Sequence, residues 1–204
     1  MSLLKEIKSC FFMRGKSLSL YFFFLFVFYS CSTMKYKDMA SSDPGKLIAL
    51  RDSLDKELSP ELIDAFIDAY NRVGTQAYNS GNYEKSIKMF LNSQELSIGD
   101  TLSRYYLLMA SGKKKYESGK KELLWESIQD FYKASALYPN VGEPFYLIGQ
   151  SYLKIGDKDF DLIIESYDKA LSLDVDEELK ISINNSRAEA IRRKNLLKNF
   201  LLLI

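Results

Sequence analysis

Histidine is absent from this 204-residue chain, and cysteine occurs only twice, at Cys10 and Cys31. Without histidine, the chain lacks the commonest general base and the commonest metal ligand at neutral pH. Both cysteines lie in residues 1–31, so the remainder has no disulfide framework, thiolate metal site or cysteine nucleophile. No serine motif or carboxylate pair has a recognisable catalytic context. We therefore predict a protein that is not an enzyme and that needs no cofactor or metal.

A phosphate-binding loop is also missing. Lysine follows glycine at Gly112 and at Gly119, but neither pair has the glycine five residues earlier that such a loop requires. Charge gives no argument for nucleic acid either. Residues 1–31 hold four basic residues and one acidic residue, which leaves 24 basic and 26 acidic residues in the remainder. Such a near-neutral surface lacks the basic patch that phosphate backbones require, so we expect no nucleic-acid partner.

Residues 1–31 have the order of an export signal. Basic residues up to Lys16 precede a strongly apolar run over 18–29, and a small residue, Ser30, follows. The run is shorter than the roughly 20 apolar residues of a membrane-spanning helix. The segment FYSC, residues 28–31, resembles the lipobox of bacterial lipoproteins, in which the cysteine is acylated and becomes the first mature residue. The resemblance implies a signal peptide over 1–30 and a lipid anchor on Cys31, since two or three acyl chains make attachment stable.

Alternatives to this interpretation stay open. Phe28 and Tyr29 depart from the leucine and small residue of the lipobox. Export with cleavage nearby but no lipid is one alternative, and an uncleaved anchor is another. Met13 is an alternative start that gives a signal of more usual length. Ser32 is not the aspartate that retains lipoproteins at the inner membrane in some bacteria, so the resemblance favours the periplasmic face of the outer membrane.

A polar segment follows the signal. Residues 31–45 lack periodicity and contain the turn cluster SSDPG, so we expect a flexible tether. A leading helical segment is expected over 46–66. Within it, Ser59 and Pro60 are typical of an N-cap followed by the first residue of a helix.

Two later segments are similar when aligned on Gly74 and Gly149. In each, a second glycine follows seven residues later, at Gly81 and Gly156. Aromatic residues flank these glycines at matching positions: Tyr70, Tyr83 and Phe90 in one segment, and Phe145, Phe160 and Tyr167 in the other. The pattern predicts two helices joined by a tight turn, because the first glycine permits close helix packing and the second ends the first helix. We expect these aromatic residues, with Phe131 and Tyr152, to lie in the core.

This pattern resembles the tetratricopeptide repeat (TPR) family, whose period is 34 residues. The resemblance implies an all-α fold: a short α-solenoid of about three helix-turn-helix units over residues 67–175. We place the units at 67–100, 101–141 and 142–175. The middle unit is degenerate, because its first helix lacks the glycine and residues 112–122, GKKKYESGKKE, are expected to form a solvated connector.

Residues 176–204 are expected to cap the solenoid. The pattern of residues 176–195 predicts a helix with a polar outer face. Such a terminal helix shields the last groove of a solenoid from water. The apolar tail FLLLI, residues 200–204, is expected to fold back onto this helix. A contact with a partner or a membrane, and a misplaced stop in the gene, are the alternatives.

In TPR proteins the first helix of each unit lines a concave groove that holds a peptide or a partner helix. Transferring the family's groove positions to this chain gives eight residues: Asn71, Thr75, Tyr78, Asn79, Tyr146, Gln150, Leu153 and Lys154. Some family members clamp a C-terminal carboxylate with a lysine and an asparagine at the first two of these sites. This chain has Asn71 and Thr75 there in its first unit, so no such clamp is expected.

The leading hypothesis is a membrane-anchored TPR lipoprotein that acts as a protein-binding scaffold in the bacterial cell envelope. One alternative is a groove that binds a small molecule or a glycan strand. Another is a structural subunit of an envelope or secretion complex, using the convex face and the FLLLI tail. These classes remain open because a fold alone does not decide function.

Overall fold

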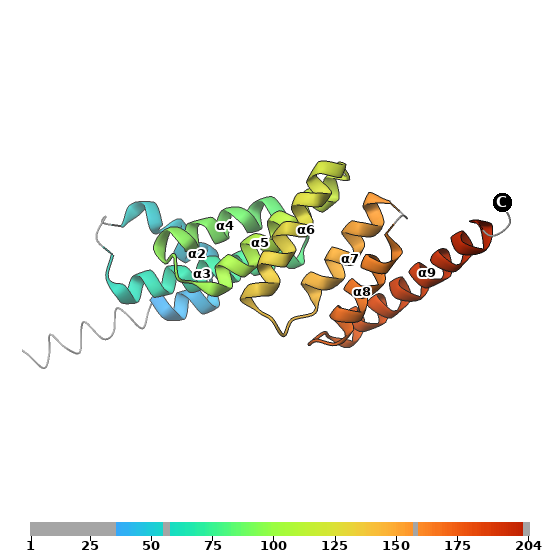
Figure 1. The fold of residues 1–204 in the computed structure, drawn as a ribbon. Coiled ribbons are helices and arrows are strands. Elements are labelled where there is room, and N and C mark those ends of the chain that lie inside the picture. The colour runs from blue at the N-terminus through green and yellow to red at the C-terminus, as the bar shows by residue number, and fades with distance from the viewer. Residues whose placement is uncertain (1–35, 55–57, 157–158, 202–204) are drawn as a thin grey trace, which may run out of the picture. The chain divides into compact units, whose positions relative to one another are not determined.

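The structure is a computed structural model that describes residues 36–54, 58–156 and 159–201 (Figure 1). The predicted signal peptide, Cys31 and residues 202–204 lie outside these ranges. The described part is helical and contains one isolated β-bridge, between Val141 and Asp174. The prediction of an all-α, TPR-like solenoid is thus confirmed. None of the described helices is long and apolar enough to cross a membrane.

The described part of the chain divides into two compact units, with the boundary between Ala69 and Tyr70. In the first, residues 36–42 are helical, although we expected them to belong to a flexible tether. Helix α2 (Pro44–Ala49) follows, with the Asp43 side chain accepting a hydrogen bond from the amide of Lys46 at its N-terminus. A short 3-10 helix, η1 (Arg51–Ser53), comes next, and the Arg51 guanidinium lies 5.4 Å from the centroid of the Phe66 ring.

Helix α3 (Pro60–Asn79) runs from the first unit into the second. Ser59 is its N-cap, as expected: its hydroxyl accepts a hydrogen bond of 3.3 Å from the amide of Leu62. The expected boundary between a leading segment and a first repeat, at 66 and 67, therefore falls inside one continuous helix.

The second unit consists of helix pairs. The C-terminal part of α3 pairs with α4 (Tyr83–Leu96), α5 (Thr101–Ser118) with α6 (Lys121–Leu137), and α7 (Glu143–Ile155) with α8 (Phe160–Leu171). Each helix from α4 to α8 also packs against the next one along the chain. Helix α9 (Glu177–Leu201) packs against α8 in the place expected for the capping helix. We call the first and second helices of each pair helix A and helix B.

One glycine in each helix A allows the close approach of helix B. A Cβ atom on Gly74 would lie 2.8 Å from the Phe90 ring, and one on Gly149 would lie 2.5 Å from the Tyr167 ring. Gly112 has the same role in the middle unit, where a Cβ would lie 2.5 Å from Phe131. The expectation that the middle unit lacks its packing glycine is therefore wrong.

The middle unit is longer because both of its helices are longer. Residues 112–118, expected to be a connector, form the last turns of α5. The turn glycine is Gly119, in the left-handed conformation at φ 68°, and it follows Gly112 by seven residues as in the other two units. The middle unit is thus a regular helical hairpin with extended arms.

The tail of α9 also differs from expectation. The helix continues straight to Leu201, and Leu196, Leu197 and Phe200 are exposed. The first two residues of the FLLLI tail therefore extend the helix instead of folding back onto it.

Candidate functional site

Helices α3, α5 and α7 supply the surface on which the groove was predicted, and we call it the helix A face. Equivalent positions are counted from the packing glycine. The residues one position after the glycine are Thr75, Lys113 and Gln150. Those four positions after it are Tyr78, Tyr116 and Leu153, and those five positions after it are Asn79, Glu117 and Lys154. The middle member of each set was not predicted, because Gly112 had not been recognised. The seven-residue spacing from Gly112 to Gly119 was the signal that could have found it.

Tyr78 is buried and is part of a polar cluster between all three A helices. Its hydroxyl donates a hydrogen bond of 2.8 Å to Oε1 of Glu143, and the same oxygen forms an ion pair of 2.9 Å with Nζ of Lys113. The Lys113 ammonium also lies 4.4 Å from the centroid of the Tyr78 ring. Only 6% of Tyr78 is exposed, so it supports the helix A face from below and does not offer its ring to a partner.

Burial raises the pKa of the Tyr78 hydroxyl well above its usual range, and the negative charge of Glu143 raises it further. Tyr105, on α5, has a raised pKa for the same two reasons. Both hydroxyls stay protonated at neutral pH, so Tyr78 keeps its role as a hydrogen-bond donor.

A second lysine covers the equivalent tyrosine of the middle unit. Nζ of Lys154, on α7, lies 4.3 Å from the centroid of the Tyr116 ring and donates a hydrogen bond of 2.8 Å to the Tyr116 carbonyl. Each of these cation–π contacts joins one A helix to the next. They order the helix A face before any partner arrives.

The remaining predicted groove residues differ in how far their side chains are exposed. Asn71 is buried and donates 2.7 Å to Oδ2 of Asp100, the residue that also caps α5. Gln150 donates 3.0 Å to the Ser186 hydroxyl on α9. Tyr146 and Leu153 pack against the core under α7 and α8, Thr75 is half-buried, and Asn79 is exposed. Of the eight predicted residues, only Asn79 and Lys154 are exposed.

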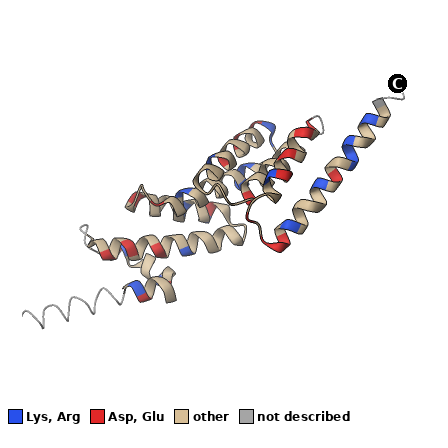
Figure 2. Ribbon diagram, turned by 60° about the horizontal axis from the view of Figure 1, so that its bottom comes forward, with Lys and Arg blue, Asp and Glu red and all other residues tan. Residues whose placement is uncertain are grey.

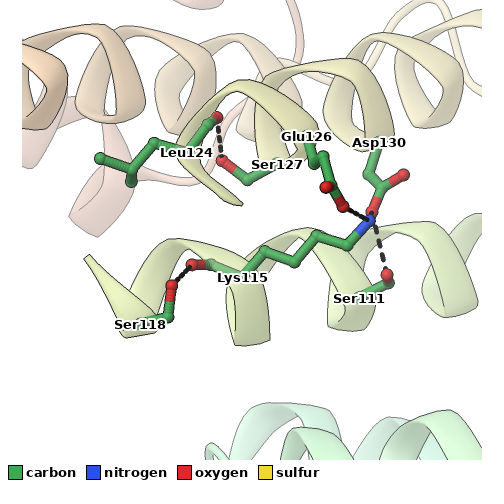
Figure 3. Close-up of polar contacts among 7 residues, drawn as sticks. All are labelled: Ser111, Lys115, Ser118, Leu124, Glu126, Ser127 and Asp130. Carbon is green, nitrogen blue, oxygen red and sulfur yellow. Dashed lines mark hydrogen bonds and ion pairs between the residues drawn. The ribbon is translucent and has the colours of Figure 1, made fainter. Parts of the chain in front are cut away.

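Three of the five lysines in the supposed connector, Lys113, Lys114 and Lys115, lie on α5 and form ion pairs instead of a solvated loop. Lys115 Nζ lies 2.7 Å from Oδ2 of Asp130 and 3.3 Å from Oε2 of Glu126, and Ser111 donates 2.9 Å to the same Asp130 oxygen (Figure 3). Partial burial lowers the pKa of Lys115, but its hydrogen bonds and the charges of Asp130 and Glu126 outweigh that effect and raise it overall. This network fixes α5 against α6.

A cleft of about 600 Å³ lies between α6 and α8, with α7 beneath it, and we call it the outer cleft. Four of its lining residues are aromatic or apolar: Tyr132, Phe145, Tyr152 and Leu162. The other five are polar or charged: Glu165, Ser166, Asp168, Lys169 and Ser172. Tyr132 contacts Phe145 edge to face at 6.3 Å between ring centroids. The sequence pattern did not reveal this cleft, since Phe145 and Tyr152 were expected in the core; both pack against it, but they are only partly buried.

The chemistry of these surfaces suits binding. Among the described residues, no group of histidine, cysteine and carboxylate side chains could hold a metal ion. On the helix A face, Lys113, Glu143 and Lys154 are engaged in ion-pair, hydrogen-bond or cation–π contacts that stabilise helix packing, whereas Glu117 has no ion pair within the described part of the chain. What the face offers outwards is a set of polar side chains above ordered aromatic rings.

No protein-family model and no characterised protein matches this sequence. Among solved structures, two of MamA, a TPR-containing protein, are similar. MamA from AMB-1 has a TM-score of 0.49 and 16% identity, with 81% of this chain and 84% of that chain covered. Residues 41 to the end of MamA from Desulfovibrio magneticus RS-1 give a TM-score of 0.46 and 16% identity, with 82% and 95% covered. At this identity, function has to be argued from the residues of this chain.

Proposed function

We propose that this chain is a lipid-anchored, non-catalytic scaffold of the bacterial cell envelope, and that its helix A face binds a segment of another protein. The observation that carries the proposal is the row formed by Asn79, Glu117 and Lys154. All three are exposed, and they occupy the same position on three successive A helices. An extended segment laid across α3, α5 and α7 meets one of them on each helix.

Ordered aromatic rings beneath the row support this function. Tyr78 and Tyr116 are each held by a lysine of the next A helix, so the face is preorganised and little side-chain entropy is lost when a partner binds. The mixture of an amide, a carboxylate and an ammonium in the row suits a polar segment bound with modest affinity. The lipid on Cys31 would hold this face close to membrane-associated partners.

Affinity capture from membrane extracts tests the binding role. We expect the double variant Asn79→Ala/Glu117→Ala to lose a partner that the wild-type protein retains. The matched control is Lys85→Ala/Lys88→Ala, which changes two exposed residues on α4, a B helix. Equal capture by the wild type and both variants would contradict a role for the helix A face.

The mass of the intact, membrane-extracted protein tests the anchor separately. The proposal predicts a chain that begins at Cys31 and carries the mass of a diacylglyceryl group. An unmodified chain, or one that retains residues 1–30, would contradict it.

A further inference from the structure

The outer cleft has an aromatic side, formed by α6 and α7. On α6, Trp125 and Tyr132 are 42% and 46% exposed, and their seven-residue spacing places them on one face of the helix. Each ring meets a ring of α7 edge to face. Trp125 contacts Tyr152 at 5.8 Å between ring centroids, and Tyr132 contacts Phe145. Trp125 therefore lies beside the cleft, which the other three rings line.

The opposite side of the cleft is polar and elongated. Four lining residues of α8 are exposed and share one face of the helix: Leu162, Glu165, Lys169 and Ser172. Ten residues separate the first from the last, which is about 15 Å along a helix axis. The volume of about 600 Å³ lies within the roughly 300–1,000 Å³ of typical ligand pockets. The cleft thus suits a ligand longer than a single small ring.

Two charged groups of this wall have hydrogen-bonding capacity left for a ligand. A glutamate followed by a lysine four residues later often forms an ion pair on a helix, but Glu165 and Lys169 form none in the described structure. The Lys169 ammonium lies instead 5.8 Å from the centroid of the Phe145 ring. The cleft therefore offers one strong acceptor and one strong donor opposite its aromatic side.

The charges around the cleft cancel. Asp168 on its rim is paired with Arg187 of α9, a helix that carries both basic and acidic residues (Figure 2). One carboxylate, Glu165, and one ammonium, Lys169, are left to face a ligand. An anion would be repelled by Glu165, and a cation would be repelled by Lys169. The balance favours a ligand without net charge.

A saccharide is complementary to both sides of the cleft. Its C–H groups can pack against aromatic rings, and its hydroxyls both donate and accept hydrogen bonds, as Glu165 and Lys169 require. A hydrocarbon chain would leave both charged groups without a partner. A proline-rich segment suits aromatic grooves, but its prolines have no N–H group to donate to Glu165.

We propose that the outer cleft binds a short chain of uncharged sugar residues. The sugar rings would pack against Tyr132 and Tyr152, and their hydroxyls would bind Glu165 and Lys169. None of the exposed residues in the row on the helix A face lines this cleft. The saccharide site is therefore separate from the proposed protein-binding face and goes beyond the proposed function.

Fluorescence of Trp125 tests this site directly, because it is the only tryptophan of the chain. The full-length protein is extracted in a detergent without a sugar headgroup and titrated with chitotriose, cellotriose and maltotriose, which are uncharged trisaccharides. We expect at least one of them to shift or quench the emission with a Kd of about 1 mM or tighter. No change with any of them up to about 10 mM would overturn the proposal.

Variants show whether the saccharide occupies the cleft. Glu165→Ala and Tyr132→Ala should each weaken binding about tenfold or more, because the first removes a charged acceptor and the second an aromatic ring. Glu95→Ala and Leu91→Ala on α4 are the matched controls and should bind like the wild type. All four residues are exposed, so the fold is retained. Equal binding by the cleft variants and the controls would overturn the proposal. So would a response of Trp125 to a proline-rich peptide and to no saccharide, since the cleft would then be a peptide site.

Discussion

The hydroxyl of Tyr78 donates a hydrogen bond to Glu143, 65 residues further along the chain, at 2.8 Å. The bond joins the first A helix to the third, and Lys113 of the second A helix pairs with the same carboxylate oxygen. One carboxylate therefore holds three A helices in register. Because the partners come from α3, α5 and α7, this cluster reports on the stacking of the whole solenoid.

A double-mutant cycle on Tyr78→Phe and Glu143→Gln measures this link. We expect each single change to lower the free energy of unfolding by about 1–3 kcal/mol, because Tyr78→Phe removes the donor of a part-buried hydrogen bond and Glu143→Gln removes the charge of its acceptor. The double variant should cost less than the sum, with a coupling of about 1 kcal/mol or more. Urea denaturation gives these values. Strict additivity would show that Tyr78 and Glu143 do not interact in solution.

Alkaline pH should destabilise the fold through the buried tyrosines. Their pKa is raised in the folded chain, so above the ordinary tyrosine pKa of about 10 the unfolded chain binds fewer protons than the folded one. The free energy of unfolding then falls as pH rises, by up to about 1.4 kcal/mol per pH unit for each such tyrosine. We expect a flat urea midpoint between about pH 7 and 9 and a fall above about pH 10. Tyr78→Phe should make that fall less steep, and an unchanged slope would count against burial of Tyr78.

Gly112→Ala tests whether the middle unit is a regular repeat. The added Cβ would lie 2.5 Å from the Phe131 ring, and overpacking of this kind costs about 1–3 kcal/mol. Gly99→Ala is the matched control, because no atom lies within 4 Å of its added Cβ and its φ is not positive. Thermal denaturation should show a clear loss for Gly112→Ala and none for Gly99→Ala. If the two variants melt alike, the close approach of α5 and α6 at Gly112 is wrong.

Lys115→Met tests the ion-pair network between α5 and α6. The variant leaves the buried Asp130 carboxylate with the Ser111 hydroxyl as its remaining partner, so we expect a loss of about 1–3 kcal/mol. Adding Asp130→Asn should recover part of the loss, because the unpaired charge is removed. Lys114→Met, whose partner Glu84 is exposed, should have little effect on the same denaturation curve. A larger effect at Lys114 than at Lys115 would contradict the network.

The sequence predicted the fold class because glycine and aromatic spacing reports helix packing directly. It failed at Gly112 because we imposed a 34-residue period, whereas α5 and α6 are longer than α7 and α8. The site was harder to predict. Tyr78 has the spacing of a groove residue, but Glu143 and Lys113 contact its side chain. Both residues are distant in the sequence, and no local pattern specifies such contacts. The outer cleft likewise depends on how α6 and α8 pack over α7.

Site-specific photo-crosslinking in intact cells shows whether α3, α5 and α7 bind one partner through a shared face. A photoreactive amino acid is placed at Asn79, Glu117 or Lys154 on the helix A face, and at Lys85 on α4 as the control. We expect crosslinks from all three A-helix positions to one and the same protein, and none to that protein from α4. Crosslinks to that protein from α4 alone, or to unrelated proteins from each A helix, would contradict a shared binding face.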